Sequence, residues 1–152
     1  MLQLILHLIG DYILQSDWMA NNKTSKSFAC ICHCLTYTLP FLILTRSIPA
    51  LLLIGGTHFV IDRWRLAKNV VYLKNFLSPT TNWNEVVAVS EPIKEGIVLH
   101  GATIVHLKKY SWENCKATGY PAQTPQFLAV WLLIIADNTL HLLINYLALK
   151  YL

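Results

Sequence analysis

Long apolar stretches separated by short polar turns dominate the chain. Four of these stretches approach the roughly 20 residues with which a helix crosses the core of a bilayer. The helices that they predict cover about residues 2–19, 25–45, 48–67 and 125–150. The pattern therefore predicts an all-α fold, a membrane-embedded four-helix bundle in which residues 1–152 form a single membrane domain.

Prolines and polar residues add detail to this outline. Pro40 lies inside the second predicted helix, where it favours a kink or an early end. Pro49 suits the first turn of the third helix. Residues 69–124, between the third and fourth helices, are rich in proline, glycine and charge. We expect a long cytoplasmic loop there, and its pattern is compatible with a helix, a hairpin or a segment on the membrane surface.

Composition favours a membrane protein over a soluble one. Of the 152 residues, 55% are hydrophobic and 13% are charged, and the net charge is +4. Lysine and arginine gather in the turn after the first helix and in the long segment after the third. The positive-inside rule places these loops in the cytoplasm and both termini outside, as in a multi-pass protein of the inner (cytoplasmic) membrane. Since membrane topology explains the basic charge, we expect the lipid bilayer as a partner and no nucleic acid. The sequence is also compatible with a homo-oligomer.

Three of the four predicted helices carry a histidine and an aspartate four residues apart. The pairs are His7 with Asp11, His58 with Asp62, and Asp137 with His141. A four-residue step places both side chains on one face of a helix, one turn apart. Ionisable groups inside an apolar span are costly unless they face an ion, a partner or water. The sequence therefore predicts a polar site inside the bundle.

Counting along the helices indicates that the three pairs meet. At about 1.5 Å per residue, Asp11, His58 and His141 all lie about 14–16 Å from the outer ends of their helices. His7 and Asn145 lie about one turn nearer that end. Segments that are separate in the sequence need not agree in depth, so we expect these side chains to form one cluster.

Imidazole and carboxylate groups together favour zinc, manganese or iron over magnesium or calcium, which prefer shells of oxygen ligands. We predict that the six residues of the three pairs bind one or two divalent ions. Gln15 and Asn145 extend the polar faces of the first and fourth helices, where they contact the bound group or link helices by hydrogen bonds. His33, alone on the second helix, is predicted to act as a catalytic acid or base, or as a further ligand.

These motifs resemble a family of bacterial and phage membrane proteins, the domain of unknown function 3307. The resemblance rests on HLIGDYILQSDWM from His7 to Met19, on His33, on HFVID from His58 to Asp62, and on DNTLH from Asp137 to His141. It implies an integral membrane helical protein that is similar to membrane-bound metal-dependent hydrolases. Family members often have Asp-Gln before the final histidine, where this chain has Asp137 and Asn138.

A metal ion with an open coordination position activates water for hydrolysis. We therefore predict a metal-dependent hydrolase that acts on a small or amphiphilic substrate, of which a phosphoester is one class. Two other functions use the same features. The polar groups also suit an ion- or proton-translocating membrane component, and residues 69–124 suit a non-catalytic membrane protein that binds a partner. A purely structural polar network is the remaining interpretation.

Overall fold

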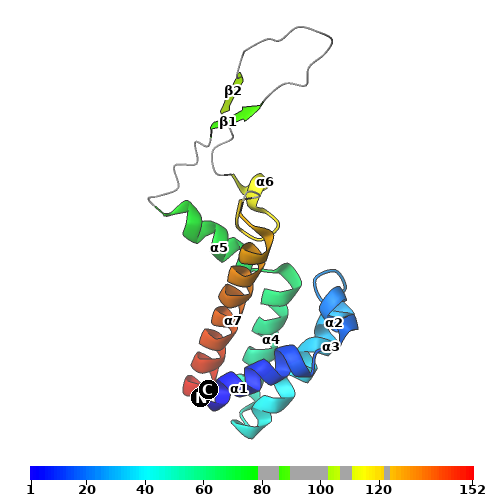
Figure 1. Cartoon of the computed structure of the whole chain (residues 1–152). Helices are drawn as coiled ribbons and strands as arrows, with labels where there is room; N and C mark the ends of the chain where they lie inside the picture. Colours follow the sequence, from blue (N-terminus) through cyan, green and yellow to red (C-terminus); the bar gives the residue numbers. More distant parts are fainter. Residues whose placement is uncertain (79–85, 90–102, 107–110, 122–123) are drawn as a thin grey trace.

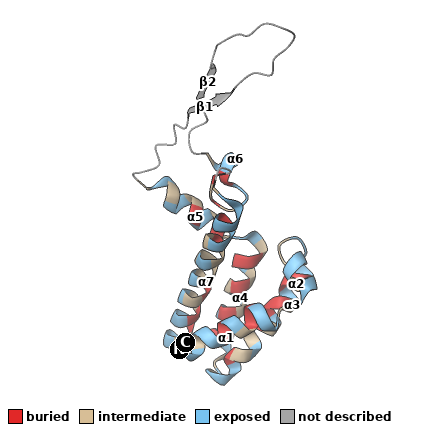
Figure 2. Ribbon diagram, in the orientation of Figure 1, coloured by how far each residue is buried: buried red, intermediate tan, exposed pale blue. Residues whose placement is uncertain are grey.

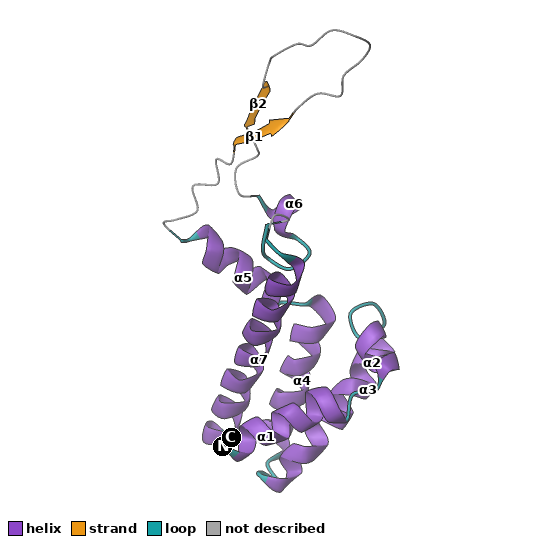
Figure 3. Ribbon diagram, in the orientation of Figure 1, coloured by secondary structure: helices purple, strands orange, loops and turns teal. Residues whose placement is uncertain are grey.

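The computed structural model describes residues 1–78, 86–89, 103–106, 111–121 and 124–152. Helices form nearly all of this part of the chain (Figure 3). The exception is an antiparallel pair of strands, β1 (Val86–Val89) and β2 (Thr103–His106), with Val86 opposite His106. The helical class is thus confirmed, with a hairpin inside the long loop. The rest of that loop, at 79–85, 90–102, 107–110 and 122–123, lies outside the described residues.

The N-terminal segment forms two helices that meet at a break. Helix α1 (Leu2–Leu8) continues into a π-helical turn, η1 (Ile9–Ile13), and α2 (Asp17–Asn22) follows. Ser16 is extended and its Oγ accepts a hydrogen bond from the backbone N–H of Met19, which caps α2. The continuous helix expected over residues 2–19 is therefore divided at Ser16.

The second and third helices follow the expected pattern. Helix α3 (Ser27–Thr38) tightens into a 3-10 helix, η2 (Leu39–Ile43), where Pro40 removes a backbone donor. Ser47 caps α4 (Ile48–Trp64) through Ala50 N–H, and Pro49 lies in its first turn as predicted. Helix α4 ends at Arg65, which is in the left-handed conformation.

Helix α7 (Gln126–Tyr151) packs along α4 in the opposite direction, and the two chain termini lie side by side near its C-terminal end (Figure 1). Helix α5 (Ala67–Phe76) also packs on α7. Ala67 and Val71 are buried there against Leu133. The long loop therefore begins with a packed helix instead of leaving the bundle at once. Helix α6 (Trp112–Cys115) lies near the C-terminal end of the loop.

Buried residues lie on the faces that α1, α3, α4 and α7 turn toward one another, and exposed residues lie on their outer faces (Figure 2). The main apolar core contains Leu6, Tyr37, Phe41, Ile54 and Ala148. Of the helices in the described part of the chain, α7 is the one long and apolar enough to cross a membrane. The apolar helices at Leu2–Ile13 and Ser27–Ile43 are shorter.

Candidate metal centre

Four side chains from three elements meet inside the bundle. Asp11 comes from η1, His33 from α3, and His58 and Asp62 from α4, and their ligand atoms lie within 4.8 Å of one another. The Nε2 atoms of His33 and His58 are 2.9 Å apart. Each lies 3.2 Å from Asp11 Oδ1 and 3.2 Å from Asp62 Oδ2. All four residues are buried. We call them the four-residue group.

These spacings suit a metal ion better than hydrogen bonds among the four side chains alone. Two imidazoles that face each other through Nε2 compete for one proton, and a carboxylate oxygen can only accept. Ligands about 2.0–2.1 Å from a tetrahedral ion lie about 3.3 Å from one another, close to the distances observed. A divalent ion would also offset the cost of burying two carboxylates. The four-residue group could therefore hold a metal ion.

Asp62 also belongs to a second group that includes two residues of α7. His141 Nε2 lies 3.4 Å from Asp62 Oδ1 and 3.5 Å from Asp137 Oδ2. His141 is buried, whereas 30% of the Asp137 side chain is exposed. The second group, Asp62 with Asp137 and His141, thus shares a carboxylate with the first and reaches the surface through Asp137.

His7 lies beside these groups, and both of its ring nitrogens have partners. Its Nε2 is 2.6 Å from Asn138 Oδ1, which can only accept, so Nε2–H is the donor. Its Nδ1 then accepts from the hydroxyl of Tyr37 at 2.9 Å, and that hydroxyl in turn accepts a hydrogen bond from Asn145 Nδ2. Asn138 Nδ2 donates in turn to the hydroxyl of Tyr12. His7 Nδ1 also lies 3.5 Å from Asp11 Oδ2. Both ring nitrogens of His7 are therefore engaged in contacts with side chains, and His7 belongs to neither group of side chains that could hold an ion.

Tyr37 connects this network to the four-residue group. Its ring stacks on the imidazole of His58, with the centroids 3.7 Å apart and the planes 21° apart. Tyr37 also lies against Gly10 of η1. A side chain does not fit at that position, because a Cβ at Gly10 would lie 2.6 Å from Tyr37 Cδ2. Since hydrogen bonds fix its hydroxyl, the Tyr37 ring holds His58 in one orientation.

Lys23, in the turn after α2, brings a positive charge to the carboxylates. Its Nζ lies 2.8 Å from Asp62 Oδ2. Arg63 holds this turn against α4 by donating hydrogen bonds to the carbonyl oxygens of Thr24 and Ser25. Burial alone would lower the pKa of Lys23, but the Asp62 carboxylate outweighs burial and raises that pKa above the usual lysine value. Lys23 is therefore positively charged at neutral pH.

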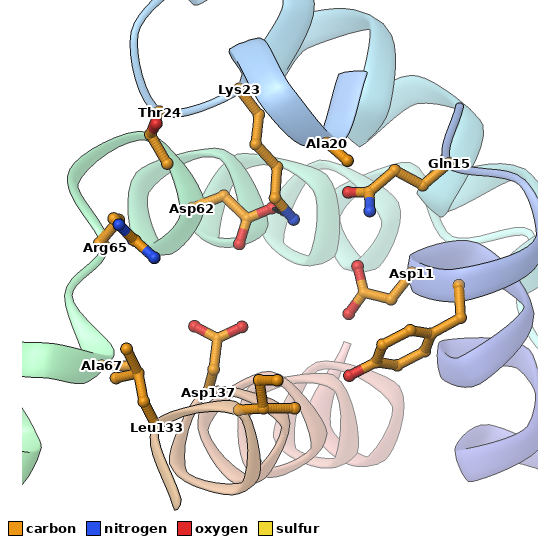
Figure 4. Close-up of a pocket in the computed structure, with 12 residues that line it drawn as sticks. Asp11, Gln15, Ala20, Lys23, Thr24, Asp62, Arg65, Ala67, Leu133 and Asp137 are labelled. Atoms are coloured by element: carbon orange, nitrogen blue, oxygen red, sulfur yellow. Dashed lines mark ion pairs between the residues drawn. The ribbon is translucent and has the colours of Figure 1, made fainter. Parts of the chain in front are cut away.

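A cavity of about 230 Å³ opens beside the two groups (Figure 4). The carboxylates of Asp11, Asp62 and Asp137 point into it, and Lys23 reaches in next to Asp62. The guanidinium of Arg65 points toward the space between Asp62 and Asp137. It forms no ion pair with any residue that the structure describes. The cavity therefore contains both acidic groups that suit a metal and a cation that suits an anion.

The structure brings together most of the residues that the sequence predicted. The predicted metal ligands found in the two groups are Asp11, His58, Asp62, Asp137 and His141. His33, predicted as an acid or base or as a ligand, is one of the four buried side chains that could hold an ion. Gln15 lines the cavity. Asn145 and His7 instead lie together in the hydrogen-bond network around Tyr37.

Sequence reasoning missed Tyr37, Lys23 and Arg65 as parts of the site. A signal existed for Tyr37, because it lies one helical turn after His33 and shares its face. No comparable signal existed for Lys23 and Arg65, whose side chains reach the cavity from turns at the ends of helices.

These features define a helical protein with a buried histidine and aspartate cluster that could hold a metal. The chain belongs to the family described as Protein of unknown function (DUF3307), whose model matches residues 1–90. The family predicted from the sequence is thereby confirmed. The match includes the complete four-residue group, whereas Asp137 and His141 follow it. No curated protein and no solved structure matches the chain.

Proposed function

We propose that the protein is a metal-dependent hydrolase whose site lies within a membrane. The observation that carries the proposal is the convergence of His33, His58, Asp11 and Asp62. Their side chains are buried beside a cavity, and each imidazole nitrogen lies 2.9–3.2 Å from the other and from one oxygen of each carboxylate. Mixed nitrogen and oxygen ligands favour zinc, manganese or iron. Such an ion supplies a Lewis acid that activates water for attack on an ester.

The charges around the cavity support a substrate with an anionic group, and a phosphoester is the class that fits best. Arg65 and Lys23 line the cavity, and Lys23 already pairs with Asp62. The guanidinium of Arg65 is left to bind two phosphate oxygens at once. In the hydrolysis of a phosphomonoester, the water oxygen forms the new P–O bond, the ester P–O bond breaks, and the alcohol leaves with a proton.

Exposed apolar side chains support a membrane location. Helix α7 has 26 residues, so its length of about 39 Å exceeds the roughly 30 Å core of a bilayer. Large hydrophobic side chains are at least 65% exposed on four elements, at Ile13, Leu35, Leu52 and Phe127. Soluble proteins rarely expose extended apolar surface of this kind. A multi-pass arrangement in the cytoplasmic membrane, with the basic end of α4 inside, accounts for both features.

A hydrolysis assay tests the proposal. Protein purified in detergent is stripped with a chelator, reloaded with Zn²⁺ or Mn²⁺, and assayed with p-nitrophenyl phosphate. We expect turnover in the reloaded protein, none in the stripped protein, and none in Asp62→Asn. Equal turnover in all three samples would refute the proposal. Metal flux into liposomes without hydrolysis would favour the transport alternative instead. A protein whose function survives Asp62→Asn but is lost when residues 69–124 are replaced would favour partner binding.

Replacing Arg65 tests the anionic substrate class. We expect Arg65→Gln to weaken binding of inorganic phosphate to the metal-loaded protein by roughly 10- to 100-fold, because a hydrogen bond to a charged group contributes about 1.5–3 kcal/mol. Isothermal titration calorimetry measures the change. Arg46→Gln is the control. It also removes one arginine charge, but Arg46 lies just before the first residue of α4, whereas Arg65 follows its last residue. Equal weakening in both variants would show a general charge effect and contradict a specific contact.

A further inference from the structure

The two carboxylate oxygens of Asp62 face different sets of side chains. Oδ2 lies 3.2 Å from Nε2 of His33 and 3.2 Å from Nε2 of His58. Oδ1 lies 3.4 Å from Nε2 of His141. Asp62 therefore takes part in both groups at once, with a different oxygen in each. A carboxylate in this position can bridge two metal ions.

We infer that the site holds two divalent metal ions bridged by Asp62, the second of them bound by Asp62, Asp137 and His141. The inference rests on the proposed metal-dependent function and specifies the centre that performs it. Two-metal hydrolytic sites hold their ions about 3.5–4 Å apart, a separation that a bridging carboxylate spans. The shared carboxylate explains why the first group, from η1, α3 and α4, adjoins the two residues of α7.

His141 supports the second ion independently. This residue is 2% exposed, and its Nε2 makes no hydrogen bond of normal geometry within the described part of the chain. Buried polar atoms without partners are rare in folded proteins. This nitrogen lies 3.4 Å from Asp62 Oδ1 and 3.5 Å from Asp137 Oδ2. The three atoms are thus arranged as ligands around a common centre.

The two ions would differ in their access to substrate. The four residues of the first group would supply a complete tetrahedral shell, whereas the three of the second would leave a position open. Asp137, a ligand of the second ion, lines the cavity and is partly exposed. Arg65 points into the same space. The second ion is therefore the one that meets water and the anionic group of a substrate.

Counting bound ions and measuring their magnetic coupling tests the inference. The full chain, purified in detergent and freed of metal, is titrated with Mn²⁺, and bound metal is measured by elemental analysis and by electron paramagnetic resonance. We expect two ions per chain and a broadened signal, because bridged Mn²⁺ ions couple magnetically. Saturation at one ion would overturn the second site but keep a metal-binding protein. Saturation at none would refute the proposed function as well, and two uncoupled ions would overturn the bridge.

The substitution Asp137→Asn separates the two positions. It keeps the shape of a partly exposed side chain and removes a charged ligand from the second group alone. We expect this variant to bind one Mn²⁺ per chain with the hyperfine-split signal of an isolated ion. Asp17→Asn makes the same chemical change at an exposed position on α2 and should bind two coupled ions. Two coupled ions in a folded Asp137→Asn protein would overturn the assignment.

Discussion

Replacing His58 with alanine is expected to abolish tight metal binding. Its Nε2 lies 2.9–3.2 Å from the ligand atoms of His33, Asp11 and Asp62, so its removal opens the four-residue group on one side. Residues that only orient metal ligands already contribute about 10- to 100-fold to affinity, so the loss of a ligand should cost more than about 100-fold. Elemental analysis of wild type and variant, purified side by side in detergent, measures the loss.

The matched control is His7→Gln. His7 is also a buried histidine, but hydrogen bonds to Asn138 and Tyr37 occupy both of its ring nitrogens. We expect this variant to weaken metal binding by no more than about 10- to 100-fold, because His7 acts on the ligand His58 only through Tyr37. Loss of metal from both variants would make His7 a ligand, as the sequence predicts, and would contradict its place in the network. Equal metal in wild type and His58→Ala would contradict the centre itself. Asp11→Asn, which keeps its volume, provides a second test if His58→Ala does not fold.

The meeting of histidines and aspartates was predictable because it depends on helix geometry, which is local. The four-residue steps fixed which face each pair occupies. Depth along the helices placed Asp11, His58 and His141 at one level, and the structure places them in adjoining groups. The same count placed His7 and Asn145 one turn away together, and both contact the hydroxyl of Tyr37.

The cations of the site could not be predicted, because they depend on contacts between distant segments. Lys23 reaches Asp62 because Arg63, forty positions along the chain, holds the turn after α2 by hydrogen bonds. Helix α5 was expected as part of a loop, since the buried pair Ala67 and Val71 is too short to produce a clear apolar pattern. Only the neighbouring surface of α7 gives these residues a core to join.

The substitution Gly10→Ala is expected to destabilise the fold by about 1–3 kcal/mol, the usual cost of overpacking a core. A Cβ at this position would lie 2.6 Å from Cδ2 of Tyr37 and 3.1 Å from its carbonyl oxygen. The backbone of α3 is part of this contact, so a rotation of the Tyr37 side chain cannot relieve it. We expect the midpoint of thermal unfolding in detergent to fall by roughly 5 °C, following the usual relation between stability and midpoint.

The control for this change is Gly56→Ala, because a Cβ at Gly56 of α4 meets nothing within 4 Å. Alanine is favoured over glycine in a helix by up to about 1 kcal/mol, so this variant should unfold at or above the wild-type temperature. Since the Tyr37 ring stacks on His58, Gly10→Ala should also weaken metal binding. Added metal should then raise the unfolding midpoint of Gly10→Ala less than that of wild type, because the stabilisation of a fold by a ligand grows with the logarithm of the ligand's affinity. If the two glycine variants unfold at the same temperature and respond equally to metal, then η1 and α3 do not pack as closely at Gly10 as the structure shows.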